Sequence, residues 1–100
     1  MARTLGIDEI RQTVSALGAQ YGAERIYLFG SYARGEAEPN SDVDLRIDKG
    51  SIYGLFALAG LKLAIEEQLE TKVDLLTTDS LDRQFLDSIR SEEVLLYGNQ

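Results

Sequence analysis

The acidic pair Asp42 and Asp44 follows a Gly30-Ser31 dipeptide, with ten residues between Ser31 and Asp42. Alternate side chains of a strand point to the same face, and their Cα atoms lie roughly 6.5 Å apart. At an effective dielectric constant of about 20, two carboxylates at that separation repel by about 2–3 kcal/mol. Proteins usually offset such repulsion by holding a hard divalent cation through oxygen ligands. The pair therefore indicates a metal site.

A third carboxylate, Asp74, lies mid-strand between apolar neighbours in the segment 72–76. An acidic side chain is costly there unless something pairs with it. If its strand lies beside that of Asp44, three carboxylates gather around two Mg²⁺ ions, the arrangement that suits in-line nucleotidyl transfer. Gly30 lacks a Cβ, so the backbone and Ser31 can approach a phosphate closely.

The composition narrows the chemistry that such a site could use. At 100 residues the chain is expected to form one domain, over 1–100. It contains neither Cys nor His, so acid–base and metal chemistry must rest on carboxylates, hydroxyls, Lys or Arg. The formal net charge of −7 argues against a nucleic-acid surface and is compatible with a bound cation or a basic partner protein.

Periodicity and breakers predict the elements that must position these residues. Apolar residues at steps of three and four predict a helix over 7–21, and Gly22 ends it. A short helix is expected at 31–34, a long helix over 52–70 capped by Ser51, and another from Asp79 or Ser80 to Arg90. Strands are expected at 25–29, 43–47, 73–77 and 94–97, so helices should pack on a small sheet.

Nothing in the chain indicates secretion or a membrane span. The N-terminus leads into an acidic helix rather than an apolar leader, and the longest apolar stretch, 52–61, is too short to cross a bilayer. The expected compartment is the cytoplasm, without membrane contact.

The helix expected over 52–69 is apolar on two roughly opposite stripes, which predicts burial on two sides. Either neighbouring helices of the same fold cover both stripes, or one stripe contacts another subunit or partner. The stripes consist of Ile52, Phe56, Ala59 and Leu63, and of Leu58, Leu61, Ile65 and Leu69.

The spacing from Gly30-Ser31 to the two aspartates, with a later strand carboxylate, resembles the polymerase-β-type nucleotidyltransferase superfamily. Within it, the chain is similar to the minimal nucleotidyltransferases, called MNT proteins, from its first helix to Leu95-Leu96-Tyr97. The stretches 33–35 and 41–45 are also typical of the group. The resemblance implies an α+β fold (α/β-like), with helices packed around a small mixed sheet.

The same resemblance implies roles for the residues. ATP would be the substrate, with two Mg²⁺ ions during catalysis. Gly30 and Ser31 would lie at the phosphates, and Asp42 and Asp44 would bind metal. Asp74 would bind the catalytic metal and help to deprotonate the acceptor hydroxyl.

Two arginines near the motif have open roles. Arg34 either clamps a phosphate or is an exposed charge. Arg46 shares the face of Asp44, where it either pairs with the carboxylates, touches substrate or has no part in the site.

Three hypotheses about function remain open. Many minimal proteins of this group are antitoxins encoded beside a HEPN-domain RNase toxin, which they neutralise by complex formation and by transferring AMP to a toxin tyrosine. The first hypothesis is such a protein adenylyltransferase, and the second is a module that masks its partner by contact alone. The third is the catalytic subunit of a two-chain enzyme acting on a small molecule such as an aminoglycoside. Few residues follow Asp74, so the acceptor site is expected on another chain, which favours a protein acceptor.

Overall fold

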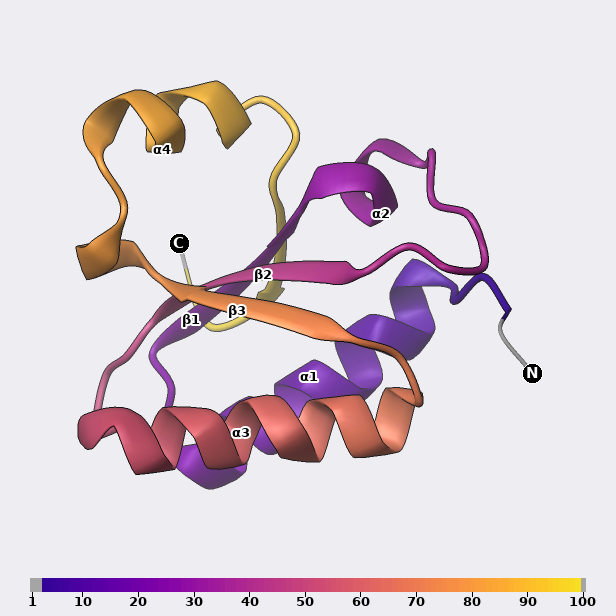
Figure 1. Ribbon diagram of the computed structural model, residues 1–100. Helices are drawn as coiled ribbons and strands as arrows, with labels where there is room; N and C mark the ends of the chain where they lie inside the picture. The colour runs from indigo at the N-terminus through magenta and orange to yellow at the C-terminus, as the bar shows by residue number, and fades with distance from the viewer. Residues whose placement is uncertain (1–2, 100) are drawn as a thin grey trace.

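The computed structural model describes residues 3–99, which form a four-stranded sheet with helices on both sides (Figure 1). The strand order is β3-β2-β1-β4, with β2 and β3 parallel and the other neighbours antiparallel. This mixed sheet confirms the expected fold class. The strands are β1 (Arg25–Phe29), β2 (Val43–Asp48), β3 (Val73–Thr77) and β4 (Val94–Tyr97).

The core lies between one face of the sheet and two long helices, α1 (Ile7–Tyr21) and α3 (Gly54–Leu69). In β2 buried and half-buried residues alternate, so its apolar side chains enter this core while Asp44 and Arg46 point to the other face. The short helices α2 (Gly30–Arg34) and α4 (Arg83–Ile89) lie on that other side (Figure 1). The largest fully buried side chains include Ile10, Val14, Ile26, Leu28, Leu45, Ile47, Leu61 and Ile65.

The β2–β3 pairing decides where the acidic residues meet. Because the two strands are parallel, α3 connects them as a crossover helix, and their register pairs Asp44 with Asp74. On the other side of β2, Asp44 pairs with Phe29, the last residue of β1. The sheet thus brings the third carboxylate beside the first pair and next to the Gly30 turn.

Two predicted helix starts were wrong. The long helix α3 begins at Gly54 rather than at residue 52, and its N-cap, Tyr53, makes no side-chain cap. Ser51 does not cap it, because its backbone N–H donates to the Gly22 carbonyl (2.9 Å) and ties this segment to the end of α1. Ile52, predicted to be helical, is instead buried in the core ahead of the helix.

The last helix likewise begins later than predicted. Residues Thr78–Ser80 form a single 3₁₀ turn, η1, and α4 follows only at Arg83. The carboxylate of Asp82 accepts a hydrogen bond from the Phe85 N–H (2.7 Å) and caps α4. Asp79 and Ser80 therefore do not open the helix.

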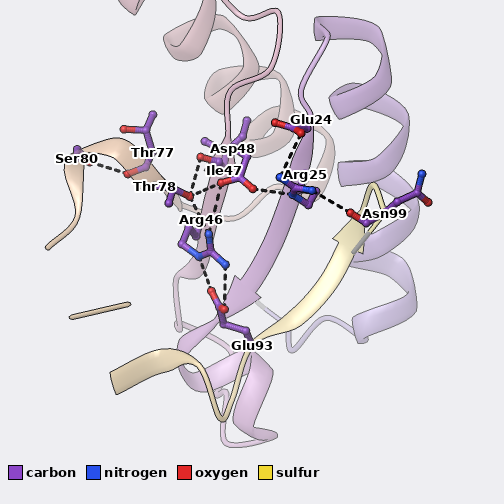
Figure 2. A network of polar contacts seen from close by, with 10 residues as sticks. All are labelled: Glu24, Arg25, Arg46, Ile47, Asp48, Thr77, Thr78, Ser80, Glu93 and Asn99. Carbon is purple, nitrogen blue, oxygen red and sulfur yellow. Dashed lines mark hydrogen bonds and ion pairs between the residues drawn. The ribbon is translucent and has the colours of Figure 1, made fainter. Parts of the chain in front are cut away.

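A polar network around Arg46 joins the end of β2 to the turn that precedes β4 (Figure 2). The Arg46 guanidinium donates two hydrogen bonds to Glu93 (2.6 and 3.0 Å) and one to Thr78 (2.8 Å). The central carbon of the guanidinium, Cζ, lies 4.1 Å from the ring centroid of Tyr27 on β1, a cation–π contact. Asp48 completes the network by binding Arg25 (2.8 Å). Arg46 therefore pairs with Glu93 and Asp48 rather than with Asp42 or Asp44.

The outer surface of α3 is unusually apolar. Leu61, Ile65 and Leu69 are buried against the sheet and α1, whereas Phe56 is 95% exposed and Leu63 is 61% exposed. Within residues 3–99, neighbouring helices thus cover one apolar stripe and leave most of the other in solvent, which favours the second of the two readings of this helix. No helix in the described range has the length and apolar character needed to cross a membrane.

The Arg46–Glu93 pair should matter for stability, because both side chains are only 12% exposed. Replacing Glu93 with Gln leaves the guanidinium without its counter-charge, and we expect the free energy of unfolding to fall by about 2 kcal/mol. Urea denaturation measures this loss. The matched variant Glu67→Gln, at an exposed position of α3, should change it by less than about 0.5 kcal/mol. Equal effects of the two substitutions would contradict a stabilising role for the network.

Candidate functional site

The turn between β1 and α2 is shaped around the carboxylate of Asp44. Gly30 has a φ of +78°, and a Cβ added there would overlap the Asp44 carboxylate and lie 3.0 Å from its Cγ. Any other residue would therefore both strain the backbone and displace the acid. The sequence predicted that this glycine allows close approach of a phosphate; the structure adds that it makes room for Asp44.

Asp44 is the most perturbed carboxyl group of the site. Its pKa is raised from the ordinary value of 3.8 to about 6, chiefly by partial burial and then by the nearby charges of Asp74 and Asp42. Hydrogen bonding with Asp74 has the same effect, while the positive charge of Arg34 acts weakly against it. Two carboxylates that share a hydrogen bond need a proton between them, and a bound cation can take the place of that proton.

The three predicted ligands are brought to one region but do not converge on a single point. Asp44 and Asp74 are in register on adjacent strands, and Asp42 precedes β2 in the loop, half-buried. Among residues 3–99, no three acidic side chains are grouped closely enough to hold a metal ion as they stand. The donor set itself, carboxylate oxygen without imidazole or thiolate, suits Mg²⁺.

Ser31 and Arg34 lie in α2, the single helical turn that follows Gly30. The Ser31 carbonyl accepts the N–H of Glu36 (2.9 Å), which closes the turn. Arg34 donates from Nε to Glu36 (3.0 Å) and from Nη1 to Glu92 (3.2 Å). The Arg34 guanidinium is thus close enough to Asp44 to affect its pKa, but it is paired with Glu36 and Glu92.

Glu92 is a residue of this site that the sequence did not single out. Its carboxylate accepts the Gly30 N–H (2.5 Å) and the Arg34 guanidinium, although it lies 62 positions from Gly30. The only signal in the sequence is two adjacent acids before the last strand, and such pairs are common on surfaces. No local pattern could have placed it here.

Packing of α4 over the end of β1 brings Glu92 to this place. The ring of Phe85 meets that of Phe29 edge to face, with centroids 5.8 Å apart. The chain then turns after α4, and Glu93 is anchored by Arg46 as described above. The site therefore combines two adjacent carboxylates, of which Asp44 has a raised pKa, with a tight turn that offers an N–H and a guanidinium. Such a site can hold a cation and an anionic group side by side.

Comparison with known proteins agrees with this geometry. Residues 12–100 match the family model described as "Polymerase beta, Nucleotidyltransferase". A candidate protein adenylyltransferase of Methanocaldococcus jannaschii is 36% identical over 90 residues, which cover 90% of this chain and 97% of that protein. The protein adenylyltransferase MntA of Thermococcus cleftensis is 34% identical over 94 residues, with 90% and 95% covered.

Among solved structures, a toxin–antitoxin complex with AMP-PNP contains a chain of the same fold. It superposes with a TM-score of 0.78 at 25% sequence identity, over 90% of this chain and 74% of that one. The family match spans most of the chain and includes every residue of the site. The chain therefore belongs to the polymerase-β-type nucleotidyltransferases, and within them it is a homologue of minimal proteins named as protein adenylyltransferases.

Proposed function

We propose that this enzyme transfers AMP from ATP to a hydroxyl group, most simply a tyrosine, of a HEPN-domain toxin and thereby acts as its antitoxin. The observation that carries the proposal is the in-register pair Asp44 and Asp74 beside the Gly30 turn. The similar chain bound in a toxin–antitoxin complex with an ATP analogue supports both the partner and the nucleotide. The relative MntA, named as a protein adenylyltransferase, supports a protein acceptor.

In this proposal Asp42, Asp44 and Asp74 would hold Mg²⁺, which neutralises triphosphate charge and polarises the phosphoryl group when it is bound. The acceptor oxygen forms a bond to the α-phosphorus of ATP, and the bond from that phosphorus to the bridging oxygen breaks, so that pyrophosphate leaves. Asp74, exposed on the edge strand β3, takes the proton of the acceptor hydroxyl. Asp44, less exposed, stays close to the nucleotide turn.

The phosphates would lie along the Gly30–Ser31 turn. The positive φ of Gly30 directs the chain from β1 into α2 without a side chain in the way. Arg34, one turn later, can contribute a charge-assisted hydrogen bond to a phosphate once its acidic partners release it.

Neutralisation by contact alone is the second candidate function, and the outer surface of α3 favours it. Tyr53, Leu55 and Phe56, at the N-terminal end of α3, are at least 82% exposed. An open, mainly apolar groove of about 530 Å³ continues this surface between α3 and β3. Apolar surface of this kind is typical of a protein-binding site. It lies on the side of the sheet opposite the carboxylates, so binding and chemistry can be tested separately.

The catalytic proposal predicts that Asp44→Asn abolishes AMP transfer. Purified protein, its cognate toxin, Mg²⁺ and ATP labelled on the α-phosphate should give a labelled toxin, and the variant should lower this rate at least about a hundredfold. Asp8→Asn, which removes an exposed acid on α1, is the control and should transfer AMP normally. An unlabelled toxin with the wild-type enzyme would end the catalytic version of the proposal.

The binding proposal predicts that Phe56→Asp weakens toxin binding at least about tenfold, because a charge enters an apolar interface. The side chain is 95% exposed, so the fold and the binding of AMP-PNP with Mg²⁺ should not change. Gln68→Glu adds the same charge at another exposed position of α3 and serves as the matched control. Calorimetric titration of each variant with toxin decides the question, and equal affinities for both variants would exclude this surface as the interface.

The Asp44 pKa also predicts a dependence of stability on pH. Since the folded-state pKa is about 6 and the ordinary value is 3.8, the native state binds the extra proton between these values. Ionisation of Asp44 therefore lowers the free energy of unfolding as the pH rises from about 4 to 6, and the loss persists at pH 7. Allowing for solvent screening of a half-exposed group, we expect a cost of about 1 kcal/mol.

Asp44→Asn removes this cost, so at pH 7 without metal its melting temperature should exceed that of the wild type by about 4–8 °C, while near pH 4 the two should agree. Millimolar Mg²⁺ should raise the wild-type melting temperature by mass action and leave the double variant Asp42→Asn with Asp44→Asn unaffected. Thermal melts between pH 4 and 8, with and without Mg²⁺, measure both effects. A double variant that still responds to Mg²⁺ would contradict the metal assignment.

A further inference from the structure

The carboxylate of Glu92 lies on the groups that the proposed nucleotide site would offer to a phosphate. The Gly30 N–H donates to it at 2.5 Å, and Arg34 Nη1 donates to its two oxygens at 3.2 and 3.3 Å. The side chain is only 18% exposed, so this is an inward-facing contact and not a loose surface pair. A carboxylate so placed presents charge and paired oxygen atoms much as a phosphate does.

The backbone around Glu92 is fixed independently of this contact. The N–H groups of Glu92 and Glu93 both donate to the Ile89 carbonyl (3.1 Å each), and the Glu93 side chain is held by Arg46. Rotation about the side-chain bonds of Glu92 is therefore enough to move its carboxylate away from Gly30. The contact can be made and broken while the fold stays intact.

A triphosphate and the Glu92 carboxylate cannot both occupy this position, because like charges at contact distance repel strongly where solvent is partly excluded. We infer that Glu92 competes with the nucleotide for the Gly30 turn and Arg34, and so lowers the affinity of the site for phosphate-bearing ligands. This inference rests on the proposed function, which places the phosphates at that turn. A ligand that also gains Mg²⁺ contacts at the aspartates displaces Glu92 at a lower concentration than AMP or inorganic phosphate, which make fewer contacts.

The variant Glu92→Gln tests the inference, because it keeps the shape and the acceptor for the Gly30 N–H but removes the charge. Calorimetry with AMP-PNP and Mg²⁺ should show a dissociation constant at least about fivefold lower than that of the wild type, since the competing state is depopulated. Inorganic phosphate should gain affinity by a similar factor, because it competes with the same occupied state of the turn. Glu92→Ala, which lacks the acceptor as well, should also bind AMP-PNP more tightly.

Glu36→Gln is the matched control. It removes an equal charge that also pairs with Arg34 (3.0 Å), but from an exposed position with no contact to Gly30. Its affinity for AMP-PNP should stay within about twofold of the wild type. An equal gain in Glu36→Gln would mean that general charge, and not the Glu92 contact, governs binding, which would overturn the inference.

The Gly30 amide gives a readout that a purely structural role of Glu92 would not move. In nuclear magnetic resonance spectra without nucleotide, its proton should lie further downfield in the wild type than in Glu92→Gln, because it donates to a charged acceptor. If the wild type binds AMP-PNP and both Glu92 variants bind it equally or more weakly, the inference about Glu92 is overturned, while the proposed nucleotide site stands. Failure of wild type and variants alike to bind AMP-PNP would refute the nucleotide site itself.

Discussion

Repulsion between Asp44 and Asp74 is the constraint around which the rest of the structure is arranged. The two acids lie opposite each other on the parallel strands β2 and β3. A shift of either strand by one residue would change the register and separate them. That slip is prevented from the opposite face, because Val43, Leu45 and Val73 would lose their places in the core. Hydrophobic burial on one side of the sheet thus holds an electrostatically unfavourable pair on the other.

The positive charges near this pair do not neutralise it. Arg46 lies two residues beyond Asp44 on the same face, yet it is bound by Glu93, Asp48 and the ring of Tyr27. Arg34 is shared between Glu36 and Glu92. Partial burial and the neighbouring acids then raise the pKa of the Asp44 carboxyl to about 6, so at neutral pH the group is mostly ionised at a cost that a bound cation would relieve. The unfavourable charge is what makes the site ready for a metal and an anionic substrate.

The sequence predicted the parts of this arrangement that depend on local spacing. Alternation placed Asp44 on one strand and the order of elements placed Asp74 on another, whereas Asp42, expected on the strand of Asp44, lies in the loop before β2. That the two strands are neighbours is a tertiary fact, which the structure supplies. The errors have the same origin. Ser51 is a good capping residue by type, but its backbone is bonded to Gly22 in a distant turn. Glu92 reaches Gly30 only because α4 packs on Phe29. Residue type and periodicity carry no information about such contacts.

The sheet also separates two kinds of surface that a partner protein could use. The carboxylates lie on the face that α2 and α4 flank, whereas the exposed apolar side chains project from α3, which packs on the opposite face (Figure 1). A partner bound only at α3 would leave the ionised acids in contact with solvent, and so would not add to their desolvation cost. Conversely, a substitution that abolishes transfer at Asp44 changes no atom of the α3 surface. A substitution can therefore abolish AMP transfer without affecting partner binding at α3, or the reverse. This independence allows the two activities to be measured separately.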